Sequence, residues 1–354
     1  MLGPYVHNID PIIGSVFGIY LWWYGLSYTL GFLQIHLFLR RARGRMGLTL
    51  SEAYSLTLVF SVGVLAGGRL VEVLFDEWPF YREHPGLIPA LWLGGMASHG
   101  LLVGAAASTW LFCWRYRKCF LSVADELVIP GAVLLGIGRL GNFIDGQIVG
   151  RVTDAWWGVQ FPYADGFRHP VVLYDGLKNL LLIPLLLLIR RLRPAPGFVA
   201  ASFVFWYAFL RIFVDLFRDY PTHRLDLGTG QTLNILMTLL GAGLLVWSRF
   251  KPLAFRRSAP APSFTVAPAP GRFHLALKRA AVALLLLFSL TLPGNWTQDI
   301  PARYGQRHPG LRHSRLYPHI DTAPPGRLSS STSREEGSPQ PSDSAGTVSL
   351  EKSR

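Results

Sequence analysis

Long apolar runs constrain the fold of this chain more than any other feature. A helix needs about 20 residues to cross the hydrocarbon core of a bilayer, and seven runs come close to that length. They cover residues 16–39, 53–75, 94–114, 122–138, 171–189, 198–217 and 231–248. Only 16% of the 354 residues are charged, against about 25% in an average globular domain. The sequence therefore predicts an all-α integral membrane protein with a seven-span helical core, and it argues against a soluble enzyme.

Basic residues gather in alternate connections between these runs. Residues 40–45, 115–118, 190–193 and 249–257 together hold 14 Lys and Arg. Apart from Arg139, which closes the fourth run, the other connections hold five: Arg82, Arg151, Arg168, Arg218 and Arg224. Because cytoplasmic loops carry the excess of Lys and Arg, the N-terminus and residues 139–170 are expected outside the cytoplasm. The same excess accounts for the net charge of +13, so no nucleic-acid partner is expected.

The last hundred residues differ in composition from the rest. We divide the chain into a membrane domain at 1–253, a Pro- and Ala-rich linker at 254–274, a short hydrophobic segment at 275–294 and a polar, disordered tail at 295–354. Lys278-Arg279 precede the apolar run of the short segment, which predicts an eighth, in-to-out segment. A re-entrant or surface helix is the alternative, since 13 apolar residues are few for a span. The Arg and His residues at 299–320 are compatible with binding to anionic lipid or glycan surfaces, and also with a solvated tail.

A glycine-rich motif, Gly138-Arg139-Leu140-Gly141-Asn142, closes the fourth run. Glycine permits non-helical backbone and close approach of a ligand. The planar fork of donors on Arg139 matches a phosphate, and Asn142 can donate and accept hydrogen bonds. The motif therefore fits a phospholipid headgroup site, and a structural turn with Arg139 reaching the interface is the alternative.

Other ionisable residues lie within the apolar runs, where they are costly and often functional. His99 can exchange a proton near neutral pH, or it can be a hydrogen-bonded structural group. Tyr207, Arg211 and Asp215 are four residues apart and share a helical face. Arg211 and Asp215 fit either a self-neutralising pair or an arginine that faces a headgroup cavity and is oriented by Asp215.

Two further polar groups have a structural explanation. Arg69 and Glu72 are three residues apart, which favours a local salt bridge. His169, Tyr174 and Asp175 lie where the fifth run begins, and a tyrosine there suits the interfacial aromatic belt. The two cysteines of the chain, Cys113 and Cys119, indicate neither a disulfide framework nor a metal site.

The motif and its companions resemble the bacterial prolipoprotein diacylglyceryl transferase family. The signature of that family is similar to Gly138-Arg139-Leu140-Gly141-Asn142-Phe143-Ile144 followed by Gly150-Arg151. Further matching segments follow in the family's order: Trp23-Tyr24-Gly25, Gly67-Gly68-Arg69, Ser98-His99-Gly100, His169-Pro170 with Leu173-Tyr174, Tyr207 with Arg211, and Gly230-Gln231. The resemblance covers about residues 5–250 and excludes the linker, the eighth segment and the tail.

The resemblance implies a multi-pass enzyme of the bacterial inner membrane whose active site faces away from the cytoplasm. Such an enzyme moves the diacylglyceryl group of phosphatidylglycerol to the lipobox cysteine thiol of a prolipoprotein and releases glycerol phosphate. Its partners are phosphatidylglycerol, lipobox peptides and the membrane, and no metal or dissociable cofactor is implied.

The resemblance also implies roles for individual residues. The catalytic set, which holds the phosphate and assists removal of the thiol proton, is His99, Arg139 and Arg211. The substrate-binding set is Tyr24, Asn142, Gly150 and Tyr207. The supporting set is Arg69, Asp145, Gln147 and Asp215.

Three positions and one segment depart from the family's pattern. Gln147 stands where the signature has a glutamate, Asp215 is one methylene shorter than the usual glutamate, and Leu101 replaces a glycine. The segment from His169 to Asp175 also differs from the usual Ser-Gln and final Glu. An active transferase, a non-catalytic lipid-binding paralogue and a related transferase with a different acceptor are therefore all considered.

Overall fold

The computed structural model describes residues 5–192, 194–219, 229–250, 272–294 and 299–320. The chain divides into a compact unit at 1–319 and a second unit at 320–354, and the description below concerns the first. Its long helices are α1 (Trp23–Ala42), α2 (Leu50–Val71), α4 (Ser98–Tyr116), α5 (Phe120–Asp145), α6 (Val171–Arg191), α7 (Phe198–Asp215), α8 (Thr229–Phe250) and α10 (Arg272–Ser289). Two short helices are α3 (Trp78–Glu83) and α11 (Ile300–Tyr304).

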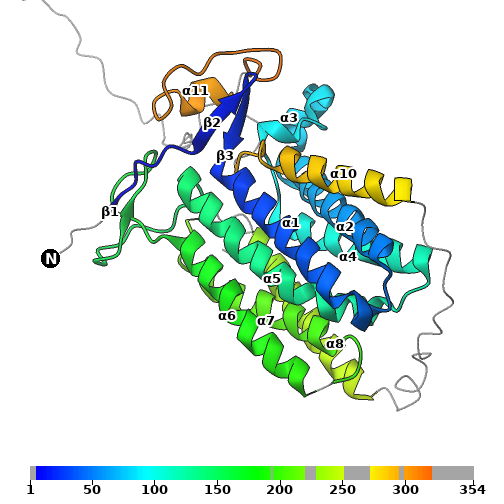
Figure 1. The fold of residues 1–354 in the computed structure, drawn as a ribbon. Coiled ribbons are helices and arrows are strands. Elements are labelled where there is room, and N and C mark those ends of the chain that lie inside the picture. The colour runs from blue at the N-terminus through cyan, green and yellow to red at the C-terminus, as the bar shows by residue number, and fades with distance from the viewer. Residues whose placement is uncertain (1–4, 193, 220–228, 251–271, 295–298, 321–354) are drawn as a thin grey trace, which may run out of the picture. The chain divides into compact units, whose positions relative to one another are not determined.

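The helices form a bundle in which helices near and far along the chain pack side by side (Figure 1). α1 packs on α5, α2 on α4, α5 on α6, and α7 on α8. Among the described residues, five segments are long and apolar enough to cross a membrane: Leu50–Asp76, Phe120–Asp145, Val171–Arg191, Phe198–Asp215 and Gly230–Ser248. This is a multi-pass, mainly helical membrane protein, as the apolar runs predict, while the number of spans stays a prediction.

The bundle has two ends that can be told apart by sequence. We call the end that carries residues 138–147 the motif end, and the end that carries Arg40–Arg45 the basic end. α5 reaches the motif end at its C-terminus, next to the start of α1, because a Cβ on Gly141 would lie 2.7 Å from the Tyr24 Cα. At the basic end, Arg45 forms a forked hydrogen bond with Glu126 near the start of α5.

The first predicted span begins later than expected, at Trp23 instead of residue 16. Residues 12–22 form an antiparallel hairpin of β2 (Ile12–Val16) and β3 (Ile19–Trp22). Its two-residue turn, Phe17 and Gly18, has positive φ angles of 51° and 77°, the geometry that fits the twist of a hairpin. β-branched residues favour such strands. Residues 16–22, which we predict as the start of the first helix, therefore belong to the hairpin. β1 (Tyr5–Val6) pairs in parallel with β4 (Val159–Gln160).

The glycine-rich motif is helical and does not form the non-helical turn that we expected. α5 continues through Asp145, and between residues 138 and 147 only Gly146, which follows the helix end, has a positive φ, of 72°. The motif glycine Gly141 allows close packing of α5 on α1. The side chains of Arg139 and Asn142 therefore project from a rigid helix, which fixes their direction more firmly than a loop would.

Glycines also set the contact between α2 and α4. Gly63 and Gly67 face Gly100 and Gly104, and a Cβ on Gly104 would lie 2.0 Å from the Gly63 carbonyl oxygen. Both pairs follow the small-xxx-small spacing that lets membrane helices approach closely. This contact holds the start of α4, and with it His99, against α2.

Substitution of Gly104 by alanine is expected to lower the free energy of unfolding by about 1–3 kcal/mol, because the added methyl group overpacks the contact. The loss is expected although alanine favours helix by about 1 kcal/mol. Thermal unfolding of the purified protein in detergent measures the change. Gly243→Ala in α8 is the matched control, since nothing lies within 4 Å of its Cβ position. Equal unfolding temperatures for the two variants would contradict this packing.

α10 lies along α1 and α2 and runs from the basic end to the motif end (Figure 1). Lys278 Nζ donates to Ser51 Oγ at 2.7 Å near the start of α2. At the other end, the Trp22 amide donates to the Leu290 carbonyl at 3.0 Å. The 18 residues of α10 extend about 27 Å, close to the thickness of a hydrocarbon core. Its position is compatible with the predicted eighth segment, whose crossing of the membrane stays a prediction.

Residues 299–319 differ from the expected disordered tail. They contain α11, and Ile300, Tyr304 and Tyr317 are buried. The linker at 254–271 and the tail beyond 320 lie outside the described residues.

Candidate active site

A buried carboxylate, Asp175 on α6, is the centre of the polar interior. Its side chain is fully buried and forms ion pairs with Arg139 of α5, with Arg211 of α7 and, at 2.9 Å, with Lys178 of α6. Three cations from three helices thus converge on one carboxylate. An isolated ion inside a bundle is very costly, so each of these charges depends on the others.

Hydrogen bonds extend this cluster in two directions. Arg139 donates to Ser98 Oγ at 3.0 Å and to Asn142 Oδ1 at 3.2 Å. On the other side, Arg211 Nε lies 3.1 Å from Asp215 Oδ1. The side chains that surround Asp175 therefore come from α4, α5, α6 and α7, and they form one network at the motif end.

Asn234 of α8 joins His99 to the same network. Its amide nitrogen donates to Asp215 Oδ2 at 2.8 Å, and its Oδ1 lies 3.2 Å from His99 Nε2. Because an amide oxygen only accepts, His99 Nε2 donates this bond, and in the neutral ring Nδ1 then carries the lone pair. A proton acceptor is thus held at the end of the network.

Among the described residues, the cluster holds more positive than negative charge. Arg139, Arg211 and Lys178 supply three cations, and Asp175 and Asp215 supply two carboxylates. The excess of one positive charge lies among buried side chains, where electrostatic interactions are stronger than in water. A phosphate group would complete the charge balance, and the arginine forks suit it geometrically.

The structure brings five predicted site residues into this network: His99, Arg139, Asn142, Arg211 and Asp215. Three members were missed or assigned a structural role: Lys178, Asn234 and Asp175. A signal for Lys178 was present, because it is the one cation in the apolar run at 171–189. The pairing of Arg211 with Asp215 is confirmed, and Arg211 also faces the shared carboxylate of Asp175.

Lys178→Met is expected to destabilise the protein less than removal of Asp175. Asp175 keeps both arginine partners in this variant, so no charge is left without a counter-charge. Methionine fills a similar volume and retains contact with the Tyr207 ring, whose centroid lies 3.9 Å from Lys178 Nζ. The unfolding temperature in detergent measures the effect, and a fall as large as that for Asp175→Ala would contradict the central position of the carboxylate.

Three residues predicted to bind substrate have other contacts. The Tyr24 hydroxyl donates to the Tyr28 hydroxyl at 3.1 Å, outside the network. The Gly150 amide donates to the His169 carbonyl, and a Cβ on Gly150 would lie 2.4 Å from that oxygen. Tyr207 contacts the network through Lys178, since Lys178 Nζ lies over its ring and donates to its backbone carbonyl at 3.3 Å. Backbone packing therefore gives Gly150 a structural reason to be glycine.

Arg69 does not form the expected salt bridge with Glu72 among the described residues. Its guanidinium instead donates to backbone carbonyls of the connection between α3 and α4, including those of Leu87 and Ile88 at 2.8 Å and that of Gly94. A planar group with five donors can satisfy several carbonyls at once. Arg69 thus fixes the loop that leads into Ser98 and His99.

The end of the motif contacts the segment at 299–319. Gln147 Nε2 donates to the Tyr304 hydroxyl at 2.6 Å, and Arg307 donates to the backbone carbonyl of Asp145 at 2.8 Å. Neither Asp145 nor Gln147 contacts Arg139 or Arg211 in the described part of the chain. Burial lowers the pKa of His7, and the His7 ring packs edge-on against the ring of Phe143.

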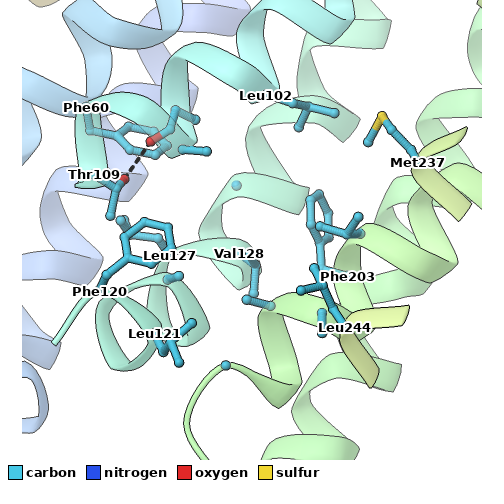
Figure 2. A pocket seen from close by; sticks show the side chains of 18 of the residues that line it. Phe60, Leu102, Thr109, Phe120, Leu121, Leu127, Val128, Phe203, Met237 and Leu244 are labelled. Carbon is cyan, nitrogen blue, oxygen red and sulfur yellow. Dashed lines mark hydrogen bonds between the residues drawn. The ribbon is translucent and has the colours of Figure 1, made fainter. Parts of the chain in front are cut away.

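An apolar cavity of about 360 Å³ lies among α2, α4, α5, α7 and α8. Figure 2 shows side chains such as Phe60, Leu102, Phe203 and Met237 around it. Lining residues lie one helical turn from network residues on three helices: Leu102 after His99 in α4, Leu135 before Arg139 in α5, and Met237 after Asn234 in α8. The polar network and an apolar cavity thus adjoin along these helices, as a site for an amphipathic molecule requires.

Comparison with known proteins identifies the family of the chain. The family model described as prolipoprotein diacylglyceryl transferase matches residues 11–247. The chain belongs to this family. The match includes the whole network and excludes α10 and the segment at 299–319.

Curated relatives agree with the family match. The chain is 39% identical over 250 residues to the phosphatidylglycerol–prolipoprotein diacylglyceryl transferase of Geobacter sulfurreducens, which covers 68% of this chain and 95% of the relative. It is 38% identical over 253 residues to the protein of that name from Nitrosomonas europaea, covering 68% and 90%. The chain is 36% identical over 247 residues to the relative from Legionella pneumophila strain Lens, and the match covers 67% of this chain and 96% of the relative.

Proposed function

We propose that this protein transfers the diacylglyceryl group of phosphatidylglycerol to the lipobox cysteine thiol of prolipoproteins and releases glycerol phosphate. The observation that carries the proposal is the buried network around Asp175, which has an excess positive charge and adjoins an apolar cavity. A phospholipid has the matching parts, an anionic headgroup and acyl chains. The names of the relatives give the same lipid donor, the same class of acceptor and the same transferred group.

The reaction is a displacement at a glycerol carbon. The thiolate sulfur forms a bond to the diacylglyceryl carbon, and the bond from that carbon to the phosphate oxygen breaks. The bonding electrons leave with glycerol phosphate. The thiolate is the reactive species, so the thiol proton must go to a base, and the lone pair on His99 Nδ1 provides an acceptor.

Fixed cations stabilise the departing phosphate. Arg139 and Arg211 lie on different helices and are both held by Asp175, so their donors are oriented before the reaction begins. Such preorganised charge in a water-poor site is usually a large contribution to catalysis. In this scheme Ser98 and Asn142 hold Arg139, and a bound phosphate takes over part of these hydrogen bonds.

The proposed location is the bacterial inner membrane, with the N-terminus and the site on the extracytoplasmic side. The 14 Lys and Arg in alternate connections support this orientation. Of the described ones, Arg45 and Arg190 pair with Glu126 at the basic end, while the network lies at the motif end. Exported prolipoproteins would then meet the site from the side on which they emerge.

A non-catalytic lipid-binding paralogue, or a transferase with a different acceptor, is the second candidate. Gln147 favours it, because a neutral amide stands where the family signature has a carboxylate. The Gln147 amide donates a hydrogen bond to the Tyr304 hydroxyl. Tyr304 lies outside the residues that the family model matches, so the neutral side chain at position 147 accompanies a contact made by the C-terminal extension of this chain.

Turnover by the purified full chain tests the proposal. The protein is reconstituted in nanodiscs that contain phosphatidylglycerol and is mixed with a lipobox peptide, and the product is detected by mass spectrometry. The expected result is a peptide that carries one diacylglyceryl group on its cysteine, with no product from a Cys→Ser peptide. Absence of product from the natural sequence, but product from Gln147→Glu, would move the assignment to a lipid-binding paralogue.

A further inference from the structure

A second cluster of polar side chains lies in the segment at 299–319, outside the family match. His313 Nε2 lies 2.8 Å from both carboxylate oxygens of Asp299, and His319 Nδ1 lies 2.6 Å from Asp299 Oδ2. One ligand atom from each of the three residues lies within 4.8 Å of the other two. Two imidazoles and one carboxylate thus converge on a single point.

The carboxylate of this cluster is held in place. Asp299 is only 4% exposed, and its Oδ1 accepts the backbone N–H of Ala302 at 2.9 Å. Ligands of protein metal sites are usually oriented in this way by a further hydrogen bond. The two histidine rings are nearly perpendicular, at 89° with centroids 5.2 Å apart, so they approach Asp299 from different directions.

The donor set is that of a zinc site. Zinc is bound by histidine nitrogen and carboxylate oxygen at about 2.0–2.2 Å, and two histidines with one carboxylate are an established set of three protein ligands. The fourth position goes to water in such sites. The side chains of His313 and His319 are 46% and 67% exposed, which leaves solvent access on their side.

The location of the cluster suggests what a bound ion would do. Asp299 begins the segment and His319 ends it, so an ion bound by both residues closes a loop of about 20 residues. Tyr304 and Arg307 lie within that loop and contact Gln147 and the Asp145 carbonyl. A segment this short has little core of its own, and small units of this kind gain stability from a structural metal.

We propose that Asp299, His313 and His319 form a Zn²⁺ site that closes the segment at 299–319 over the motif end of the bundle. The site binds the ion through His313 Nε2, His319 Nδ1 and the Asp299 carboxylate. It is separate from the lipid chemistry proposed above, so zinc binding can be established or refuted whether or not the protein transfers diacylglycerol.

Metal content is the first test. The full chain, purified without a histidine tag and stripped with EDTA, is dialysed against buffered ZnCl₂, and zinc is counted by mass spectrometry. We expect about one zinc per chain, lost in His313→Ala and in His319→Ala. His308→Ala is the matched control, because His308 lies in the same segment but pairs with Asp10 at 2.6 Å. Zinc content that is unchanged by the His313 and His319 variants, or absent from the natural sequence, would overturn the proposal.

Protection from trypsin is the second test, and it does not depend on lipid turnover. The segment offers Arg303, Arg307, Arg312 and Arg315 as cleavage sites. Zinc at about ten times its dissociation constant is expected to slow cleavage there about tenfold. Asp299→Asn keeps an oxygen to accept the Ala302 amide but weakens the metal site, and it should remove the protection. Equal protection with and without zinc in the natural sequence would identify the cluster as a hydrogen-bonded ion pair only.

Discussion

Replacement of Arg139 by lysine is expected to reduce diacylglyceryl transfer by about 10²–10³-fold while the protein remains folded. Lysine keeps the positive charge near Asp175 but loses the fork that reaches Asp175, Asn142 and Ser98 together. Removal of one preorganised donor from a site of developing charge costs a factor of that size. The measurement is the initial rate of peptide lipidation at saturating phosphatidylglycerol.

Arg45→Lys is the matched control for this variant. Arg45 also forms a forked contact with a carboxylate, Glu126, but it does so at the basic end of the bundle. Its substitution should leave the lipidation rate unchanged. If Arg139→Lys kept the natural rate, or if both variants lost it equally, the phosphate would not be bound by Arg139 in the way proposed.

Asp175→Ala is expected to lower the free energy of unfolding by about 3–5 kcal/mol and to remove activity. The substitution leaves Arg139, Arg211 and Lys178 buried without their shared carboxylate. Loss of one partner from a buried ion pair costs this much, because the remaining charge is uncompensated. Urea or thermal unfolding in detergent measures the loss of stability.

Asp219→Ala separates the effect of burial from the loss of a carboxylate. Asp219 pairs with Arg168 at 2.7 Å, but its side chain is 55% exposed, and exposed pairs contribute about 0–1 kcal/mol. The two variants should therefore differ in stability by several kcal/mol. A similar small loss for both would show that Asp175 does not hold the three cations together.

The helical bundle could be predicted from the sequence because burial in a membrane demands long apolar runs. The start of the first helix could not, since Ile12–Val16 and Ile19–Trp22 are as apolar as a span but pair as strands. The helical state of the motif was also missed. Gly141 favours a turn when the sequence is read alone. In the structure it lies within a helix, and the absence of a side chain there lets α5 pack closely on α1.

Part of the site could be predicted because charges inside apolar runs stand out. His99, Arg139 and Arg211 were found in this way and by resemblance. The convergence on Asp175 could not be found, because it depends on which faces of α5, α6 and α7 meet. Asn234 was missed since an uncharged side chain gives little signal in an apolar helix, although it connects His99 to Asp215.

Release of the leaving group is the most direct measurement of the proposed reaction. Phosphatidylglycerol with a labelled headgroup is supplied to the reconstituted protein together with a lipobox peptide, and glycerol phosphate and lipidated peptide are counted in the same sample. The account predicts one glycerol phosphate for each lipidated peptide, and neither product without the peptide. Binding of labelled phosphatidylglycerol with no release of glycerol phosphate would contradict it and would identify a lipid-binding protein.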